Sequence, residues 1–158
     1  MRTVITRILV PTDFSRPSEQ ALAYARSLAQ RFGASLHLLH VVNRPLLAEG
    51  LAAEAFIDES SDMVEVAQQR LRKQAPDAAS ANVVFGYAAK SIVQHASQLG
   101  VDLIVMGSHG RTGIAHILLG SVAEAVVRTA PCPVLTVRDP VKAPERVATA
   151  PGLHVAVD

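Results

Sequence analysis

The chain has 158 residues, which is enough for one domain with its own hydrophobic core. Hydrophobic residues make up 49% of it but aromatic residues only 4%, so we expect an aliphatic core of the kind found in parallel sheets covered by helices. A net charge of +1 gives no electrostatic reason to expect binding to nucleic acid or an anionic membrane. The single cysteine, Cys132, excludes an intramolecular disulfide.

No signal peptide is predicted after Arg2, because the short apolar run there lacks a typical h-region and cleavage site. No apolar run approaches the roughly 18 residues that a membrane-spanning helix needs. The sequence therefore predicts a soluble, cytoplasmic protein.

The first quarter of the chain predicts a strand, a helix and a second strand. An apolar run at residues 7–11 indicates a buried strand that ends near Pro11. We expect a helix after it, with Ser15 as its N-cap, Pro17 in its first turn and Gly33 at its end. Residues 35–42 predict the next strand.

Residues 43–58 carry the weakest pattern in the chain, and Pro45 and Gly50 interrupt them. Two alternatives are open for this segment: a flexible flap, or an extension of the helix that we expect from about residue 60 to residue 75.

The remainder predicts strands and helices in alternation. The strands are expected at residues 82–88, 101–107 and 131–137, and the helices at residues 88–100 and 121–130. Alternation of this kind predicts a parallel sheet with right-handed crossovers. Residues 1–138 would form a single α/β domain, and residues 139–158, rich in Pro and Ala, a tail that is flexible or docked on a partner.

The segment MGSHGRTGIAHILLGSVAE, residues 106–124, joins the fourth strand to the fourth helix and contains four glycines. Its last part reads Ser-x-x-Glu, which predicts a capping box with Ser121 as the N-cap. A helix N-terminus approached through glycines is a favourable place for a phosphate. Neither a P-loop nor a G-x-G-x-x-G pattern is present, so a plain connection between strand and helix remains an alternative.

The spacing Gly107-x2-Gly110-x9-Gly120-Ser121 resembles the nucleotide-binding signature of the universal stress protein family. RILVPTDFS resembles that family's first strand and acidic turn, LLHVV its second strand, and PCPVLTV its last strand. The resemblance extends over residues 7–138.

The resemblance implies a Rossmann-like, adenine nucleotide α hydrolase-like fold: a five-stranded parallel sheet of order 3-2-1-4-5 with helices on both faces. The ends of strands one and four would then form the point at which such sheets bind ligands. The nucleotide-binding residues would be Pro11, Thr12, Asp13, Val41, Met106, Gly107, Ser108, His109, Gly110, Arg111, Gly120, Ser121 and Val122.

Within this implied ATP site, Val41 would meet adenine through its backbone, and Asp13 would lie near the ribose or a Mg²⁺ ion. The glycines and Ser121 would hold the phosphates, and His109 and Arg111 would neutralise phosphate charge. Two alternatives remain open: Asp13 only forms a turn or cap, and the Ser121 hydroxyl only caps its helix.

Other polar residues do not suggest a second site. His37 and His40 are three apart on a predicted strand and thus on opposite faces, so they cannot share a metal ion. We expect His40 to be buried and hydrogen-bonded, and Cys132 to be buried and inert.

The resemblance implies an ATP-binding regulator of the stress response that changes its surface with bound nucleotide. No catalytic nucleophile, paired carboxylates or P-loop lysine is evident, so we expect at most weak ATP hydrolysis. Open alternatives are a slow ATPase or autophosphorylating enzyme, a ligand-free scaffold, and binding of another adenine nucleotide such as cyclic AMP. The resemblance also implies a homodimer through the closing strand, at Pro133, Val134, Leu135, Thr136 and Val137.

Overall fold

The computed structural model describes residues 4–43, 52–109 and 119–138, with residues 52–61 described by their backbone alone. Strands and helices alternate along this part of the chain, as the sequence predicts. In chain order they are β1 (Arg7–Pro11), α1 (Arg16–Phe32), β2 (Ser35–Asn43), α2 (Ala52–Gln74), β3 (Ser80–Gly86), α3 (Ala88–Leu99), β4 (Leu103–Gly107), α4 (Ser121–Thr129) and β5 (Val134–Val137).

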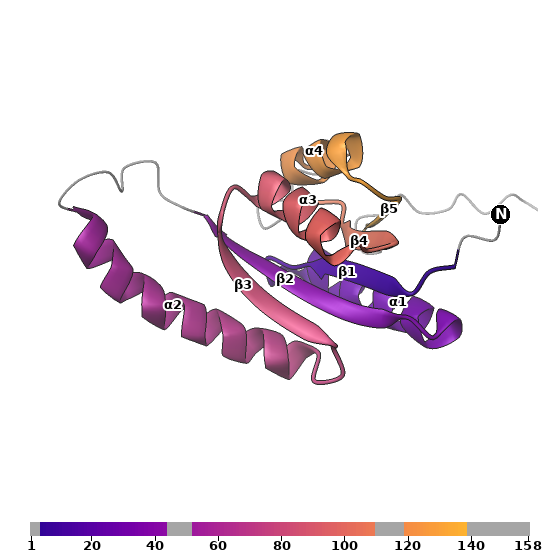
Figure 1. Cartoon of the computed structure of the whole chain (residues 1–158), viewed down its shortest axis with the longest axis horizontal. Coiled ribbons are helices and arrows are strands. Elements are labelled where there is room, and N and C mark those ends of the chain that lie inside the picture. Colours follow the sequence, from indigo (N-terminus) through magenta and orange to yellow (C-terminus); the bar gives the residue numbers. More distant parts are fainter. Residues whose placement is uncertain (1–3, 44–51, 110–118, 139–158) are drawn as a thin grey trace, which may run out of the picture.

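The five strands form one parallel sheet of order β3-β2-β1-β4-β5, which confirms the fold class and the strand order expected from the sequence. Strand β1 lies at the centre of the sheet, with Leu9 beside His37 of β2 on one side and beside Ile104 of β4 on the other. The order reverses at this strand, because β2 and β3 extend the sheet in one direction and β4 and β5 in the other (Figure 1).

Two aliphatic clusters fill the two faces of the sheet. Ile8 and Val10 of β1 pack with α1 and α2, whereas Leu9 packs with α3 and α4. The alternation follows from the two-residue period of a strand, which sends successive side chains to opposite faces. Both faces are therefore covered, as the aliphatic composition predicts (Figure 1). No described helix is both long and apolar enough to cross a membrane.

Most element ends match the sequence prediction, and α2 is the largest difference. Ser15 is the N-cap of α1, and Gly33 ends that helix in the left-handed conformation with φ 67°. Helix α2 begins at Ala52, so residues 52–58 extend the helix, while residues 44–51 lie outside the described residues. Ala and Glu at its start are strong helix formers, although no apolar period marks them. Strand β3 begins at Ser80, two residues before the predicted start.

The two histidines of β2 lie on opposite faces of the sheet, as predicted. His40 shares the face of Leu38 and packs its ring against Phe14, and its Nδ1 donates to the carbonyl oxygen of Thr12 at 2.8 Å. His40 is half-buried rather than fully buried, but its expected hydrogen bond is confirmed.

His37 lies on the other face and belongs to a polar seam between β2, β3 and α3. Its Nε2 lies 3.0 Å from the hydroxyl of Ser35, and its Nδ1 lies 2.8 Å from the hydroxyl of Ser80. Burial lowers the pKa of His37, and the nearby charges of Arg7 and His95 lower it further. Burial also lowers the pKa of His95. Both imidazoles are therefore harder to protonate in the folded chain than in the unfolded chain.

The lowered pKa values of His37 and His95 predict that acid destabilises the fold. Both pKa values lie below the ordinary 6.5, so as pH falls through about 6.5 these histidines are protonated in the unfolded chain before they are protonated in the folded chain. Protonation therefore favours the unfolded chain, and stability that is present above this pH is lost as pH falls further. Urea unfolding between pH 7.5 and pH 5 should show a falling free energy of unfolding. His95→Gln should reduce that fall, and an unchanged pH dependence in this variant would contradict the assignment.

Candidate functional site

The candidate site lies where the connections from β1 and β4 diverge. These strands are neighbours, and α1, which follows β1, packs on one face of the sheet while α4, which follows β4, packs on the other. In open α/β sheets the carboxyl ends of two such strands form the usual ligand-binding crevice. The residues after Pro11 and after Gly107 are thereby brought together, although they are almost a hundred positions apart in the chain.

The turn after β1 is held by a chain of hydroxyl groups. The Ser18 hydroxyl donates to the carbonyl oxygen of Ser15 at 2.7 Å, so in its 3.0 Å contact with Thr12 the Thr12 hydroxyl must be the donor. The same Thr12 oxygen accepts the backbone N–H of Phe14 at 3.1 Å, and the Thr12 N–H donates to Leu39 at 2.9 Å. Thr12 and Ser18 are buried, and their hydrogen bonds fix the conformation of the turn.

Asp13 forms a tight turn with Ser15. One of its carboxylate oxygens accepts both the backbone N–H of Ser15, at 3.0 Å, and the Ser15 hydroxyl. Burial raises the pKa of Asp13, but hydrogen bonds to its carboxylate, chiefly those from Ser15, outweigh burial and hold the pKa below its ordinary 3.8. Asp13 is therefore ionised at neutral pH. Asp13 thus forms a turn, with a half-buried carboxylate at the end of β1.

At the other side of the site, the predicted capping box is wrong. Gly120, not Ser121, is the N-cap of α4, and the N–H of Glu124 donates to the carbonyl oxygen of Gly120 at 2.8 Å. The exposed Ser121 is the first helical residue, and its hydroxyl makes no hydrogen bond to a described residue. Glycine is an accepted N-cap, and the helix begins one residue earlier than the Ser-x-x-Glu pattern indicates.

The first three backbone N–H groups of α4, at residues 121–123, have no intrahelical acceptor and donate to no described residue. The partial positive charge of a helix N-terminus is thus available there. The N–H of Gly120, in contrast, donates to the carbonyl oxygen of Ser108 at 2.8 Å, and the N–H of Ser108 donates to Val137 at 2.8 Å. These two N–H groups are therefore already engaged within the protein.

The other predicted site residues differ in how accessible they are. Pro11 and Met106 are buried, and Val41 is half-buried against the cluster on the α3 face. The Nδ1 atom of His109 lies 3.0 Å from the hydroxyl oxygen of Ser108. Val122 is exposed on α4. Gly110 and Arg111 lie outside the described residues.

Gly107 has a packing role that the sequence did not reveal. A side chain there would meet the backbone carbonyl carbon and the Cβ of Pro17 at 2.9 Å. Those atoms belong to the first turn of α1, so the glycine allows that helix to pack directly on the end of β4. This close approach brings the turn after β1 toward the segment after β4.

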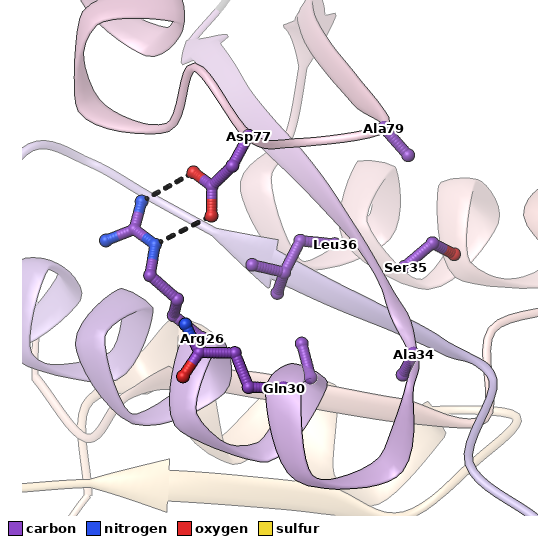
Figure 2. Close-up of a pocket in the computed structure, with 8 residues that line it drawn as sticks. Arg26, Gln30, Ala34, Ser35, Leu36, Asp77 and Ala79 are labelled. Carbon is purple, nitrogen blue, oxygen red and sulfur yellow. Dashed lines mark hydrogen bonds and ion pairs between the residues drawn. The ribbon is translucent and has the colours of Figure 1, made fainter.

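A separate hollow of about 260 Å³ lies at the opposite end of the sheet. Figure 2 shows the guanidinium of Arg26 facing the carboxylate of Asp77 there, at 2.9 and 3.0 Å. Since Leu36 and Ser35 line this hollow at the beginning of β2, it cannot contribute to a site at the carboxyl ends of the strands.

Among the described residues, no cluster of three or more His, Cys, Asp and Glu side chains could hold a metal ion by itself. Cys132 is half-buried, and its pKa is raised by burial and by the charge of Asp102, which disfavours the reactive thiolate. A doubly wound parallel sheet whose strand order reverses between β1 and β4 defines the class: an open α/β protein with a topological switch point.

The chain belongs to the universal stress protein family, whose sequence profile matches residues 5–138. It is 39% identical over 144 residues to universal stress protein MJ0531 of Methanocaldococcus jannaschii, covering 86% of this chain and 84% of that protein.

Solved structures agree with this assignment. The structure of MJ0577 from Methanocaldococcus jannaschii matches with a TM-score of 0.72 and 34% identity, over 86% of this chain and 97% of that one. A universal stress protein in complex with cyclic AMP matches with a TM-score of 0.63 and 26% identity, over 85% of this chain and 97% of that one.

The contact at Gly107 predicts that Gly107→Ala lowers the free energy of unfolding by about 2–3 kcal/mol, because a methyl group would overlap the Pro17 backbone. Urea unfolding would measure the loss. Gly33→Ala is the control. Gly33 has φ 67°, but a Cβ added there would have no atom within 4 Å, so only the backbone conformation opposes the substitution, by about 1 kcal/mol. A Gly107→Ala variant as stable as the native chain would contradict the close approach.

Proposed function

We propose that this chain is an ATP-binding universal stress protein that acts as a nucleotide-dependent, homodimeric regulator of the stress response. The observation that supports it best is the set of open N–H groups at residues 121–123, at the start of α4 and on the switch-point side of the sheet. A helix N-terminus of this kind binds phosphate through its amides and its dipole. The cyclic AMP complex of a related protein adds support for an adenine nucleotide.

The phosphates would lie at the start of α4, with the exposed Ser121 hydroxyl as a further donor. The adenosine part would lie toward the ends of β1 and β2, near Asp13 and Val41. The proposed orientation follows from charge: the helix N-terminus is positive, while the Asp13 carboxylate is negative and would repel phosphate unless a cation lay between them.

Mg²⁺ fits this arrangement. It commonly binds through one or two carboxylates together with the phosphates of a nucleotide, and it needs no cage of protein ligands. Asp13 is a half-buried, ionised carboxylate and could supply such a ligand. When bound, Mg²⁺ would neutralise phosphate charge beside Asp13.

The phosphate position predicts that Ser121→Asp weakens ATP binding at least about tenfold, because a carboxylate at the helix start repels phosphate. The same carboxylate favours the helix dipole, so the melting temperature should stay the same or rise slightly. Calorimetry with ATP and Mg²⁺, together with thermal unfolding, would measure both effects.

Ser121→Asn is the matched control, similar in size to Asp but without charge, and should bind ATP much more tightly than Ser121→Asp. Equal affinities for the two variants would place the phosphates elsewhere. If the native chain binds neither ATP nor cyclic AMP, the nucleotide function fails and a ligand-free scaffold becomes the better description.

The proposed homodimer would form through β5, which lies at an edge of the sheet. The carbonyl oxygens of Pro133 and Val137 accept hydrogen bonds from the backbone N–H groups of Ile104 and Ser108, in β4 and directly after it. Since the residues of a strand alternate in direction, the backbone groups of Val134 and Thr136 point away from β4, toward the open edge. A second copy could pair with these groups across a two-fold axis.

Thr136→Pro tests this dimer without opening the sheet, because it removes an N–H that points away from β4. We expect a monomer by size exclusion with light scattering, and a dimer for the native chain and for the Thr136→Ala control. Leu135 and Val137 are less suitable sites, since both pack against the core cluster on the α1 face. A Thr136→Pro variant that stays dimeric would place the interface elsewhere.

A further inference from the structure

Phe14 adopts an unusual backbone conformation within the turn that carries Asp13. Its φ is 63°, and among the described residues other than glycine it is the one with a positive φ. The left-handed conformation is unfavourable for a residue with a bulky side chain, so the surrounding structure must hold it in place.

The Phe14 ring contacts two other planar groups. One is the His40 ring of β2, with a distance of 4.5 Å between ring centroids and an angle of 38° between ring planes. The guanidinium carbon of Arg70, from α2, lies 4.3 Å from the Phe14 ring centroid. Arg70 makes no salt bridge with a described residue, so this cation–π contact is its evident interaction.

The same stack is tied to the hydrogen bonds of the turn. His40 donates to the carbonyl oxygen of Thr12 at 2.8 Å, and the Thr12 hydroxyl oxygen accepts the N–H of Phe14 at 3.1 Å. The Phe14 ring is therefore held by the two neighbouring elements, while its backbone is held through Thr12. Asp13 lies between these two fixed residues, so its position depends on both.

We propose that Arg70 is a positioning residue: it clamps Phe14 against His40 and thereby holds the Asp13 turn in the conformation that receives the adenosine part of a nucleotide. The predicted effect of Arg70 on nucleotide binding rests on the proposed function, but its effect on the turn can be measured without nucleotide. Arg70 acts here through Phe14 and touches no ligand. It links α2 to a site built at the ends of other elements.

The first test uses the nucleotide-free chain. Arg70→Gln removes the cation while keeping a long polar side chain, and Arg72→Gln, two residues further along the exposed part of α2, makes the same change in charge. By NMR, we expect the amide protons of Phe14 and Ser15 to exchange about three- to tenfold faster in Arg70→Gln than in Arg72→Gln. Arg70→Lys should restore part of the protection.

The second test measures binding by calorimetry. Arg70→Gln should weaken ATP binding about three- to tenfold relative to Arg72→Gln. Measured without Mg²⁺, its affinity for inorganic tripolyphosphate should equal that of Arg72→Gln, since that ligand would then use only the start of α4. A general loss of structure would weaken both ligands and lower the melting temperature.

The outcomes separate the two ideas. Equal exchange rates in the two Gln variants would overturn the clamp, and so would an equal loss of ATP and tripolyphosphate affinity. If the native chain fails to bind ATP, the nucleotide function and the binding role of Arg70 both fail, and the exchange rates still decide whether the clamp holds the turn.

Discussion

The pairing of β1 with β4 is the constraint on which the candidate site depends. It joins the two halves of the doubly wound sheet, and it is held at both ends. At the amino end, one carboxylate oxygen of Asp102 accepts hydrogen bonds from the backbone N–H groups of Thr6 and Arg7 and from the Thr6 hydroxyl. At the carboxyl end, the bare backbone of Gly107 lets Pro17 and the start of α1 pack on β4. The turn after β1 is thereby held close to the end of β4.

The sequence predicts the parts of this arrangement that depend on local pattern. Periodicity locates the strands and helices, and the glycine signature indicates the connection from β4 to α4. Contacts between distant residues could not be predicted in the same way. The packing of Pro17 on Gly107 depends on how α1 crosses the sheet. Gly120 and Ser121 are both residues that can serve as an N-cap, so the residue types alone do not decide which of them begins α4.

The two sides of the candidate site differ in how far their polar groups are already engaged. Around Thr12 and Ser108, hydroxyl and amide groups bond to the protein, whereas the amides at the start of α4 have no described acceptor. A ligand would thus find one side with its geometry already fixed and one side with donors available. Such preorganisation lowers the conformational entropy that binding must overcome.

The buried polar residues support the same conclusion from another direction. Among the described residues they are Thr12, Ser18 and Ser108, and all three lie at the carboxyl ends of β1 and β4 or in the first turn of α1. A buried hydroxyl is unfavourable unless it is hydrogen-bonded, and an aliphatic core of this size has no need of one for its packing. Each hydroxyl here bonds to a neighbouring polar group within the turn or the adjacent segment. These hydroxyl groups therefore fix the backbone around the switch point, whereas the sheet itself is held by its aliphatic core.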